Sequence, residues 1–281
     1  MTVLVLVLLQ AAPIAARTGV FASPRMQESS GVAVSRTHAG VLWTHNDSGD
    51  GPYLYATNLS GADRGLLRVP GADAVDWEDI ALGPCPTRAG TCVYVADTGD
   101  NDEKRASVTL YAVPEPALPR SPRDTTATPA VLRLQYPDGP HDVEATFVSF
   151  RDGAVYLVTK GRSGTIALYR VARDLWRSRS VVTAVKLQVL PIRPNQPVGR
   201  WVTGATMRAD GRLVAIRTYT EIYLFTPRAS GRLTEVEWSP CEIAGLEPQG
   251  EGIDFLNDST LVLTSEATAR TPGTIHTVRC R

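Results

Sequence analysis

The stretch that decides the fold is Trp77-Glu78-Asp79-Ile80-Ala81-Leu82, with the runs Val93–Val95 and Val108–Val113 that follow it. Each run is rich in β-branched and aromatic residues and is bounded by Gly, Asp, Asn or Pro, as β-strands are. The same succession of three runs recurs four more times, beginning at Glu28, Glu144, Thr203 and Glu251. Repeats of about 40–50 residues with several strands each are typical of a β-propeller.

A fourth, outer strand is expected after each copy except the last, at 65–69, 130–136, 182–190 and 235–243. The last copy has no such segment after it, so we expect residues 18–22 to supply its outer strand and to close the ring. The prediction is therefore all-β: a single β-propeller with five blades of four antiparallel strands. Six blades is the alternative, because the second and third copies are long.

The N-terminal segment indicates export. Residues 2–9 are an apolar run, and small residues follow at 11–16. We expect 1–16 to be a signal peptide and 17–281 to be the propeller domain. The run is too short to span a bilayer, so no membrane span is expected. No Lys or Arg precedes it, and an N-terminal core strand is the alternative. The predicted protein is secreted or periplasmic and monomeric.

The four cysteines support the same location, because disulfides persist in oxidising compartments. Cys85 and Cys92 flank the hairpin between the first two strands of blade 2, whereas Cys241 and Cys280 belong to blades 4 and 5. We predict the disulfides Cys85–Cys92 and Cys241–Cys280. Metal binding is a weaker alternative, because the chain has no CxxC pair.

The charges balance, with 29 basic and 29 acidic side chains and a formal net charge of zero. This balance gives no electrostatic reason to expect a nucleic-acid partner or an anionic membrane.

A ring of carboxylates is expected at the propeller axis, because the first strand of each blade lines it. The ring comprises Glu28, Glu78, Glu144 and Glu251, with Thr203 as the uncharged fifth member. Converging carboxylates raise one another's pKa values, and a hard cation relieves the repulsion. Oxygen-only ligands favour calcium. Alternatively, each glutamate accepts hydrogen bonds from backbone N–H groups of the next blade.

A second polar ring is expected where the second strands end. Its members are His45, Asn46, Asp47, Asp97, Thr98, Thr159, Lys160, Arg217, Tyr219, Ser265 and Glu266. Asp47 is a further calcium ligand in this interpretation. Lys160 and Arg217 would hold an anionic ligand group, and His45 or a carboxylate such as Asp97 would act as a base. The alternative is turn chemistry, because Asp47–Gly51 and Asp97–Asn101 are good turn sequences.

Three motifs carry a family resemblance: Trp43-Thr44-His45-Asn46-Asp47-Ser48-Gly49, Trp77-Glu78-Asp79-Ile80-Ala81 and Ala96-Asp97-Thr98-Gly99-Asp100-Asn101. With them the chain resembles exported bacterial β-propeller proteins and, more distantly, phytase-like and gluconolactonase/paraoxonase-like propellers. The resemblance implies calcium at or near the axis and hydrolysis of phosphoesters or lactones there. The fourth blade lacks the axial carboxylate, a departure that argues against direct transfer of this chemistry.

Two functions are therefore expected as alternatives. The first is a secreted, calcium-binding hydrolase that acts on a small molecule. The second is a non-catalytic module that binds a glycan, a peptide or an envelope component and whose metal is structural.

Overall fold

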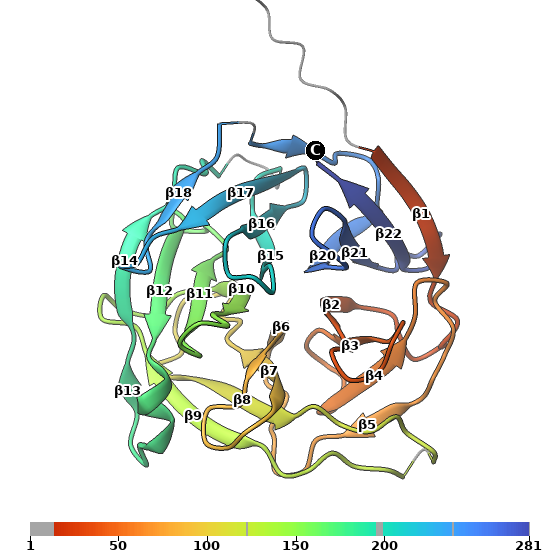
Figure 1. Cartoon of the computed structure of the whole chain (residues 1–281), viewed down its shortest axis with the longest axis horizontal. Helices are drawn as coiled ribbons and strands as arrows, with labels where there is room; N and C mark the ends of the chain where they lie inside the picture. The colour runs from red at the N-terminus through yellow and green to blue at the C-terminus, as the bar shows by residue number, and fades with distance from the viewer. Residues whose placement is uncertain (1–13, 122, 195–198, 238, 281) are drawn as a thin grey trace, which may run out of the picture.

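The computed structural model describes residues 14–121, 123–194, 199–237 and 239–280, which form one ring of five blades (Figure 1). Each blade contains four antiparallel strands, which confirms the predicted five-bladed propeller. The strands of blades 1 to 3 are β2 (Ser29–Val34), β3 (Leu42–Asn46), β4 (Tyr53–Thr57) and β5 (Leu66–Arg68); β6 (Trp77–Pro84), β7 (Thr91–Asp97), β8 (Val108–Pro114) and β9 (Ala130–Gln135); and β10 (Val143–Val148), β11 (Val155–Thr159), β12 (Ala167–Val171) and β14 (Val185–Val189). Those of blades 4 and 5 are β15 (Val202–Met207), β16 (Val214–Thr218), β17 (Glu221–Pro227) and β18 (Leu233–Glu235); and β20 (Gln249–Phe255), β21 (Leu261–Glu266), β22 (Thr274–Arg279) and β1 (Ile14–Val20).

The N-terminal strand closes the ring as expected. Strand β1 pairs antiparallel with β22 and forms the outer edge of blade 5. It begins at Ile14 rather than at Thr18, so Ile14–Ala16, the last residues of the expected signal peptide, belong to β1. Residues 1–13 of that expected segment lie outside the described residues.

Two of the expected outer strands are each divided in two. In the segment 182–190, β14 completes blade 3, whereas β13 (Val182–Thr183) pairs parallel with β9 of blade 2 and so links the two blades. In the segment 235–243, β18 and β19 (Cys241–Glu242) both pair with β17. Pro240 lies between them and has no N–H to donate to a ladder.

The apolar core is divided into five clusters, one at each contact between neighbouring blades. Each inner sheet is therefore covered on both faces, which explains why the inner strands are buried along almost their whole length. Trp77 packs between blades 1 and 2 with Trp43 and Tyr111.

Both predicted disulfides are present. Cys85–Cys92 closes the hairpin between β6 and β7, and Cys241–Cys280 joins blade 4 to blade 5. The chain also forms one short 3-10 helix, η1 (Arg173–Arg177). Within the described residues, no helix has the length and apolar character needed to cross a bilayer.

Candidate functional site

The functional candidates lie at the end of the axis where the innermost strands β2, β6, β10, β15 and β20 begin (Figure 1). The second strand of each blade is antiparallel to the first and ends at the same place, as the pairs Trp77↔Asp97 and Val143↔Thr159 show. The two polar rings expected from the sequence are therefore neighbours at one end of the propeller. We call this region the axial end.

Each innermost strand carries a β-bulge next to its first paired residues, and the bulge places one residue outside the ladder. The register leaves Glu78, Glu144, Thr203 and Glu251 unpaired in blades 2 to 5. Bulges re-aim side chains next to functional sites, and here they account for the recurrence of these four positions.

The expected equivalence of Glu28 is wrong. Ser29 pairs with Asn46 as Trp77 pairs with Asp97, so Ser30 is the counterpart of Glu78 in blade 1. Ser30 is buried, and its hydroxyl donates to the carbonyl oxygen of Glu78 at 2.5 Å. Glu28 lies two residues earlier and is exposed. The sequence alignment matched the glutamate itself, whereas strand pairing fixes the position.

The register also reveals two carboxylates that the sequence analysis missed. Asp76 and Asp142 occupy the position two residues before Glu78 and Glu144, the same position as Glu28 in blade 1. The signal was available as the repeated pattern Asp-x-Glu in Asp76-Trp77-Glu78 and Asp142-Val143-Glu144.

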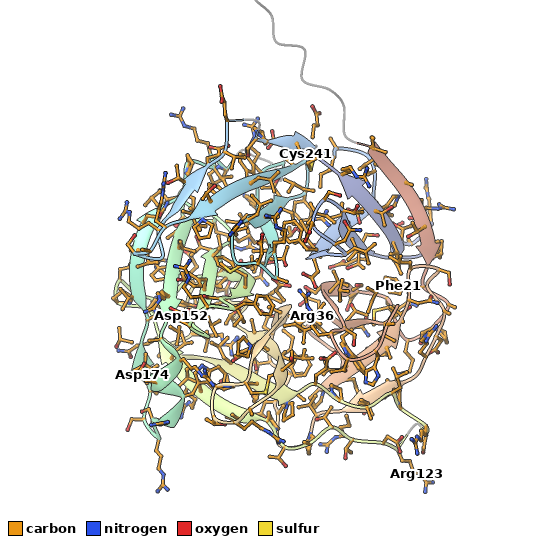
Figure 2. The ribbon with its side chains drawn as sticks, in the orientation of Figure 1. Phe21, Arg36, Arg123, Asp152, Asp174 and Cys241 are labelled. Atoms are coloured by element: carbon orange, nitrogen blue, oxygen red, sulfur yellow. A yellow bond between two sulfur atoms is a disulfide. The ribbon has the colours of Figure 1, made fainter. Side chains whose placement is uncertain are left out.

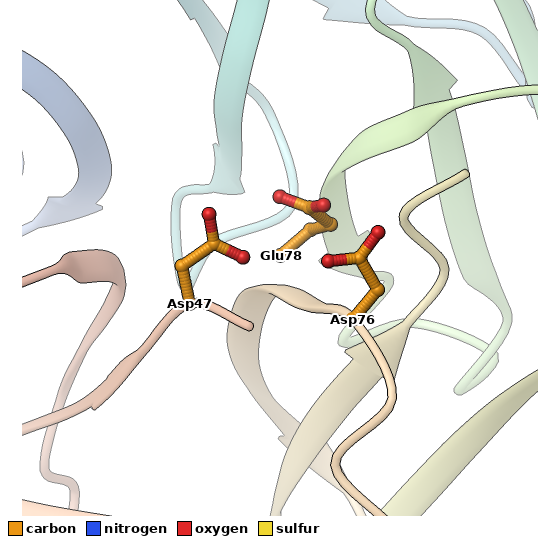
Figure 3. Close-up of side chains that lie close together, drawn as sticks. All are labelled: Asp47, Asp76 and Glu78. Carbon is orange, nitrogen blue, oxygen red and sulfur yellow. The ribbon is translucent and has the colours of Figure 1, made fainter. Parts of the chain in front are cut away.

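These residues form two groups that share Glu78. In the first group, carboxylate oxygens of Asp47, Asp76 and Glu78 lie within 4.8 Å of one another. Figure 3 shows the three carboxylates gathered around a common space from blades 1 and 2. In the second group, Glu78 has the same relation to Asp142 and Glu144 of blade 3.

The second group is neutralised by basic side chains. Lys160 Nζ lies 2.5 Å from Glu144 Oε1, in a pair that is buried. Arg162 donates to Asp142, whose other oxygen accepts the backbone N–H of Asp100 at 2.9 Å. Both cationic side chains also approach Trp201, with Arg162 Cζ 4.9 Å and Lys160 Nζ 5.9 Å from a ring centroid.

The first group has no direct ion pair among the described residues: Lys160 and Arg105 oppose the rise in the pKa values of its carboxylates only from a distance. Glu78 is 4% exposed, and among the described residues its carboxylate has neither a hydrogen-bond donor nor an ion-pair partner. A buried carboxylate without a donor is costly. The pKa of Glu78 is raised well above its usual range, first by burial and then by the charges of Glu144 and Asp47.

Gly99 makes room for this group. A Cβ atom at Gly99 would lie 2.0 Å from Glu78 Oε1 and 2.5 Å from Asp76 Oδ2. The backbone of Gly99 is not in the left-handed region, so an open space for the carboxylates, and not backbone freedom, requires glycine here.

Burial shifts the other carboxylates of the axial end in the same direction. It raises the pKa of Glu144 to about 8 against the lowering effect of Lys160, and the pKa of Glu251 to about 8 with help from Glu266. The pKa of Asp76 is raised to about 6 and that of Glu266 to about 7, again by burial first and neighbouring carboxylates second. Carboxyl groups therefore crowd one another at the axial end.

Glu251 contributes a further unsatisfied oxygen. Tyr219 donates its hydroxyl to Glu251 Oε1 at 3.0 Å, while Oε2 is buried and has no partner among the described residues. Below these carboxylates the axis is crossed by Asp79, which accepts the backbone N–H groups of Thr146 at 2.8 Å and Ala205 at 3.2 Å. Asp79 is therefore an inter-blade clasp of the kind considered for the glutamates.

His45 does not have the role expected of a base. It is fully buried, its Nδ1 lies 2.7 Å from the carbonyl oxygen of Asn46, and its ring packs against Trp77. Burial lowers its pKa to about 4. Its ring lies in the contact between blades 1 and 2, beside Trp77, and not among the carboxylates of the axial end.

Arg217 is likewise held away from any ligand. Its guanidinium is 0% exposed and donates to Glu247 Oε2 at 2.7 Å and to the carbonyl oxygen of Gly252 at 2.9 Å. Glu247 lies in the segment before β20, 30 residues away, which is why the sequence did not reveal the pair.

Asp97 organises a loop. Its carboxylate accepts the backbone N–H of Asp76 at 3.2 Å and pairs with Arg105 at 2.9 Å. In blade 1, Asn46 Oδ1 likewise accepts hydrogen bonds from the backbone N–H groups of Gln27 and Glu28. Of the four residues expected to be catalytic, Lys160 alone reaches the carboxylate groups of the axial end.

Comparisons with known proteins add little to this geometry. No protein-family model matches the chain, and no curated protein matches it. Among solved structures, a protein described as functionally unknown from Desulfotomaculum acetoxidans DSM 771 is similar, with 12% sequence identity and a TM-score of 0.44. The match covers 84% of this chain but 65% of the other, so the chain spans under two thirds of the length of that protein.

Proposed function

We propose that the axial end binds a divalent cation, calcium, through Asp47, Asp76 and Glu78. The observation that carries the proposal is the buried Glu78 carboxylate, which faces two other carboxylates and has no donor within the described residues. The donor set fits the ion, because calcium takes oxygen ligands and carboxylates above all. Because Gly99 has no side chain, there is room for the two ligands from blade 2.

We propose further that the same place receives an anionic or hydroxyl-rich small molecule, or a glycan or peptide. Lys160 lies on the neighbouring blade, and its positively charged ammonium group is paired with Glu144. A bound cation on one side and Lys160 on the other would flank an oxyanion, and Trp201 beside Lys160 offers an apolar face. Two disulfides support an oxidising location, and we propose that the protein is secreted or periplasmic.

Hydrolysis of a phosphoester or lactone is one reaction for such a site. A bound cation would supply polarisation of the reacting oxygen, and Lys160 would donate a hydrogen bond to the charge that develops on it. With His45 buried, the remaining base is Glu266. Glu266 is the last residue of β21, and the register makes it the counterpart of Lys160, which follows β11. It is partly exposed, and its carboxylate has no hydrogen bond to a described residue.

Non-catalytic binding is the second candidate. It is favoured by the specific finding that His45, Arg217 and Asp97 are each held by a structural partner. Both candidates require the cation site and differ in the fate of the ligand.

Calcium titration calorimetry, with thermal unfolding in calcium and in EDTA, tests the cation site. We expect heat of binding and a higher unfolding midpoint with calcium, because a ligand that binds only the folded state stabilises it. Glu78→Gln should abolish both effects. Asp258→Asn removes an exposed carboxylate at the opposite end of the ring and should leave them unchanged. Equal midpoints in calcium and EDTA for the wild type would contradict the proposal.

A panel of phosphoesters and lactones then separates the two functions. Turnover that is lost in EDTA and in Glu266→Gln identifies a hydrolase. Calcium binding without turnover of any panel member favours the binding module.

A further inference from the structure

A second candidate site lies at the end of the ring opposite to the axial end. It is a cavity of about 790 Å³ between blades 2 and 3. Its walls are the hairpin 86–89, Asp152 from the turn between β10 and β11, and the segment 170–177, which runs from the end of β12 through η1. Strands β6, β10 and β12 all run toward this end, and Asp152 and Asp174 lie in the same sector of the ring (Figure 2).

The lining is rich in arginine. Arg88, Arg170, Arg173 and Arg177 line the cavity together with Asp152 and Asp174. Asp152 pairs with Arg170 at 2.8 Å. Within the described residues, Arg88 and Arg177 have no hydrogen bond or ion pair through their guanidinium groups. Positive charge therefore exceeds negative charge in this cavity, although the whole chain is neutral.

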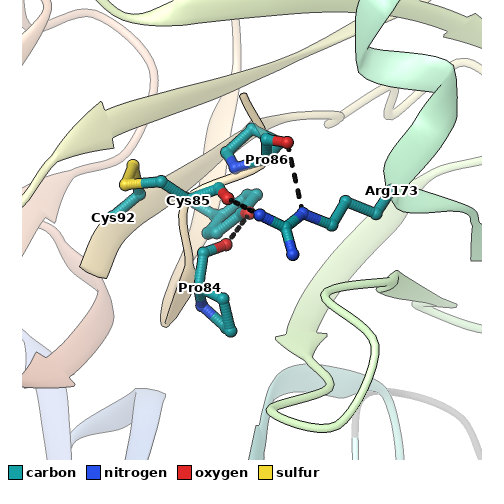
Figure 4. Close-up of a disulfide and its surroundings, with 6 residues drawn as sticks. Pro84, Cys85, Pro86, Cys92 and Arg173 are labelled. Carbon is teal, nitrogen blue, oxygen red and sulfur yellow. Dashed lines mark hydrogen bonds between the residues drawn. A yellow bond between two sulfur atoms is a disulfide. The ribbon is translucent and has the colours of Figure 1, made fainter. Parts of the chain in front are cut away.

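The walls are fixed by covalent and polar contacts. Arg173 reaches across from η1 and donates to the carbonyl oxygens of Cys85 at 2.7 Å and Pro86 at 3.2 Å (Figure 4). The disulfide Cys85–Cys92 closes the same hairpin. Because carbonyl groups carry no net charge, these hydrogen bonds orient Arg173 without neutralising it. Arg88 follows two residues after Pro86 on this pinned hairpin.

A glycine leaves room for the side chain of Arg173. Gly153 has a φ of 69°, in the left-handed region, and a Cβ atom there would lie 2.8 Å from Arg173 Cδ. The turn between β10 and β11 therefore accommodates the arginine that ties blade 3 to the hairpin of blade 2.

We propose that this cavity, the arginine pocket, binds a ligand through its phosphate groups. Guanidinium groups recognise phosphate oxygens by paired, charge-assisted hydrogen bonds. Two uncompensated guanidiniums and a third that faces only neutral oxygens suit a doubly charged group. The volume is that of a small-molecule site. The phosphate belongs to a soluble phosphorylated molecule or to a lipid headgroup, and the pocket recognises the chemistry common to both.

Calorimetry with inorganic pyrophosphate tests the pocket directly. EDTA is present throughout, so that a cation at the axial end does not recruit the probe. We expect saturable binding that weakens with salt. Arg88→Gln and Arg177→Gln should each weaken it about tenfold, the scale of one charge-assisted hydrogen bond. Arg270→Gln removes an exposed arginine at the axial end and should leave the affinity unchanged. These variants change exposed side chains, and thermal unfolding checks that they fold.

Co-sedimentation with vesicles identifies the source of the phosphate. Binding to phosphatidylglycerol vesicles but not to phosphatidylcholine vesicles, lost in the double variant of Arg88 and Arg177, assigns a lipid headgroup. Pyrophosphate binding without vesicle binding assigns a soluble ligand.

Three results would overturn the proposal. They are no binding of either probe by the wild type, equal binding by the double variant, and an equal loss in Arg270→Gln. Glu78→Gln should bind pyrophosphate as the wild type does, so the outcome is independent of the cation site.

Discussion

The substitution Gly99→Ala tests the cation site without removing any ligand. The added Cβ atom would lie 2.0 Å from Glu78 Oε1 and 2.5 Å from Asp76 Oδ2, whereas ordinary contact begins at 3.4 Å. The Glu78 oxygen must therefore move by about 1.4 Å and the Asp76 oxygen by about 0.9 Å. Calcium–oxygen bonds are about 2.3–2.6 Å long, so shifts of this size break or distort two of the three proposed bonds.

We expect Gly99→Ala to weaken calcium binding by about 10- to 100-fold, the range seen when the support of a metal ligand is lost. Stability in EDTA should change little, because the backbone of Gly99 is not left-handed and the atoms that must move are the ends of side chains. The assays are calcium calorimetry and the unfolding midpoint in EDTA.

Gly51→Ala is the matched control. Gly51 lies at the axial end and outside the left-handed region, and the nearest atoms to an added Cβ belong to the Tyr53 ring. This variant should bind calcium as the wild type does. If Gly99→Ala retains wild-type calcium affinity, the site does not involve Glu78 and Asp76, and the reasoning from the space beside Gly99 is refuted.

Three other predictions concern stability. Burial raises the pKa of Glu251 to about 8 in the folded state from an ordinary value of 4.5, so the folded state binds a proton that the unfolded chain releases. This contribution is fully present below the ordinary value and is lost as the pH rises from there through about 8; unfolding midpoints in EDTA should fall between about pH 5 and 8 and level off above, less steeply in Glu251→Gln. Glu247→Leu leaves the buried Arg217 guanidinium without its carboxylate and should lower the free energy of unfolding by about 3–5 kcal/mol in urea titrations, whereas an unchanged midpoint would contradict the pairing. Replacing Cys241 and Cys280 by serine opens a crosslink that spans 39 residues and should cost about 2–4 kcal/mol in the same assay; a loss that reduction of the wild type does not reproduce would contradict a role for this bond.

The sequence predicted the ring because the repeat is a local property. Each blade is recognisable in the sequence by three apolar runs and their turns. The strand that closes the ring was expected because the last blade lacked an outer strand. The position of side chains within a blade is less local. The glutamate of blade 1 stands two residues before the bulged position, so Ser30 and not Glu28 is the counterpart of Glu78, and the sequence alone does not fix that register.

The sequence did not predict which side chains would contact distant segments, for a related reason. His45 and Arg217 have the residue types of a catalytic site, but the register places each of them two residues before the position that Lys160 occupies in blade 3. Each residue adds about 3.3 Å along a strand, so both side chains lie deeper in the sheet than Lys160 and make buried contacts. Lys160 occupies the outward position, and it does lie among the carboxylates.

The net charge of zero also did not predict where charged side chains gather on the molecule, because an antiparallel blade places consecutive connections at opposite ends. Arg88 precedes β7 and Asp97 ends it. The seven residues of that strand, at about 3.3 Å each, place the two charges on different ends of the molecule. Both signs of charge occur at both ends, but a group of carboxylates gathers at the axial end and four arginines line the cavity at the other. Glu78→Gln should therefore leave phosphate binding intact, and Arg88→Gln should leave calcium binding intact.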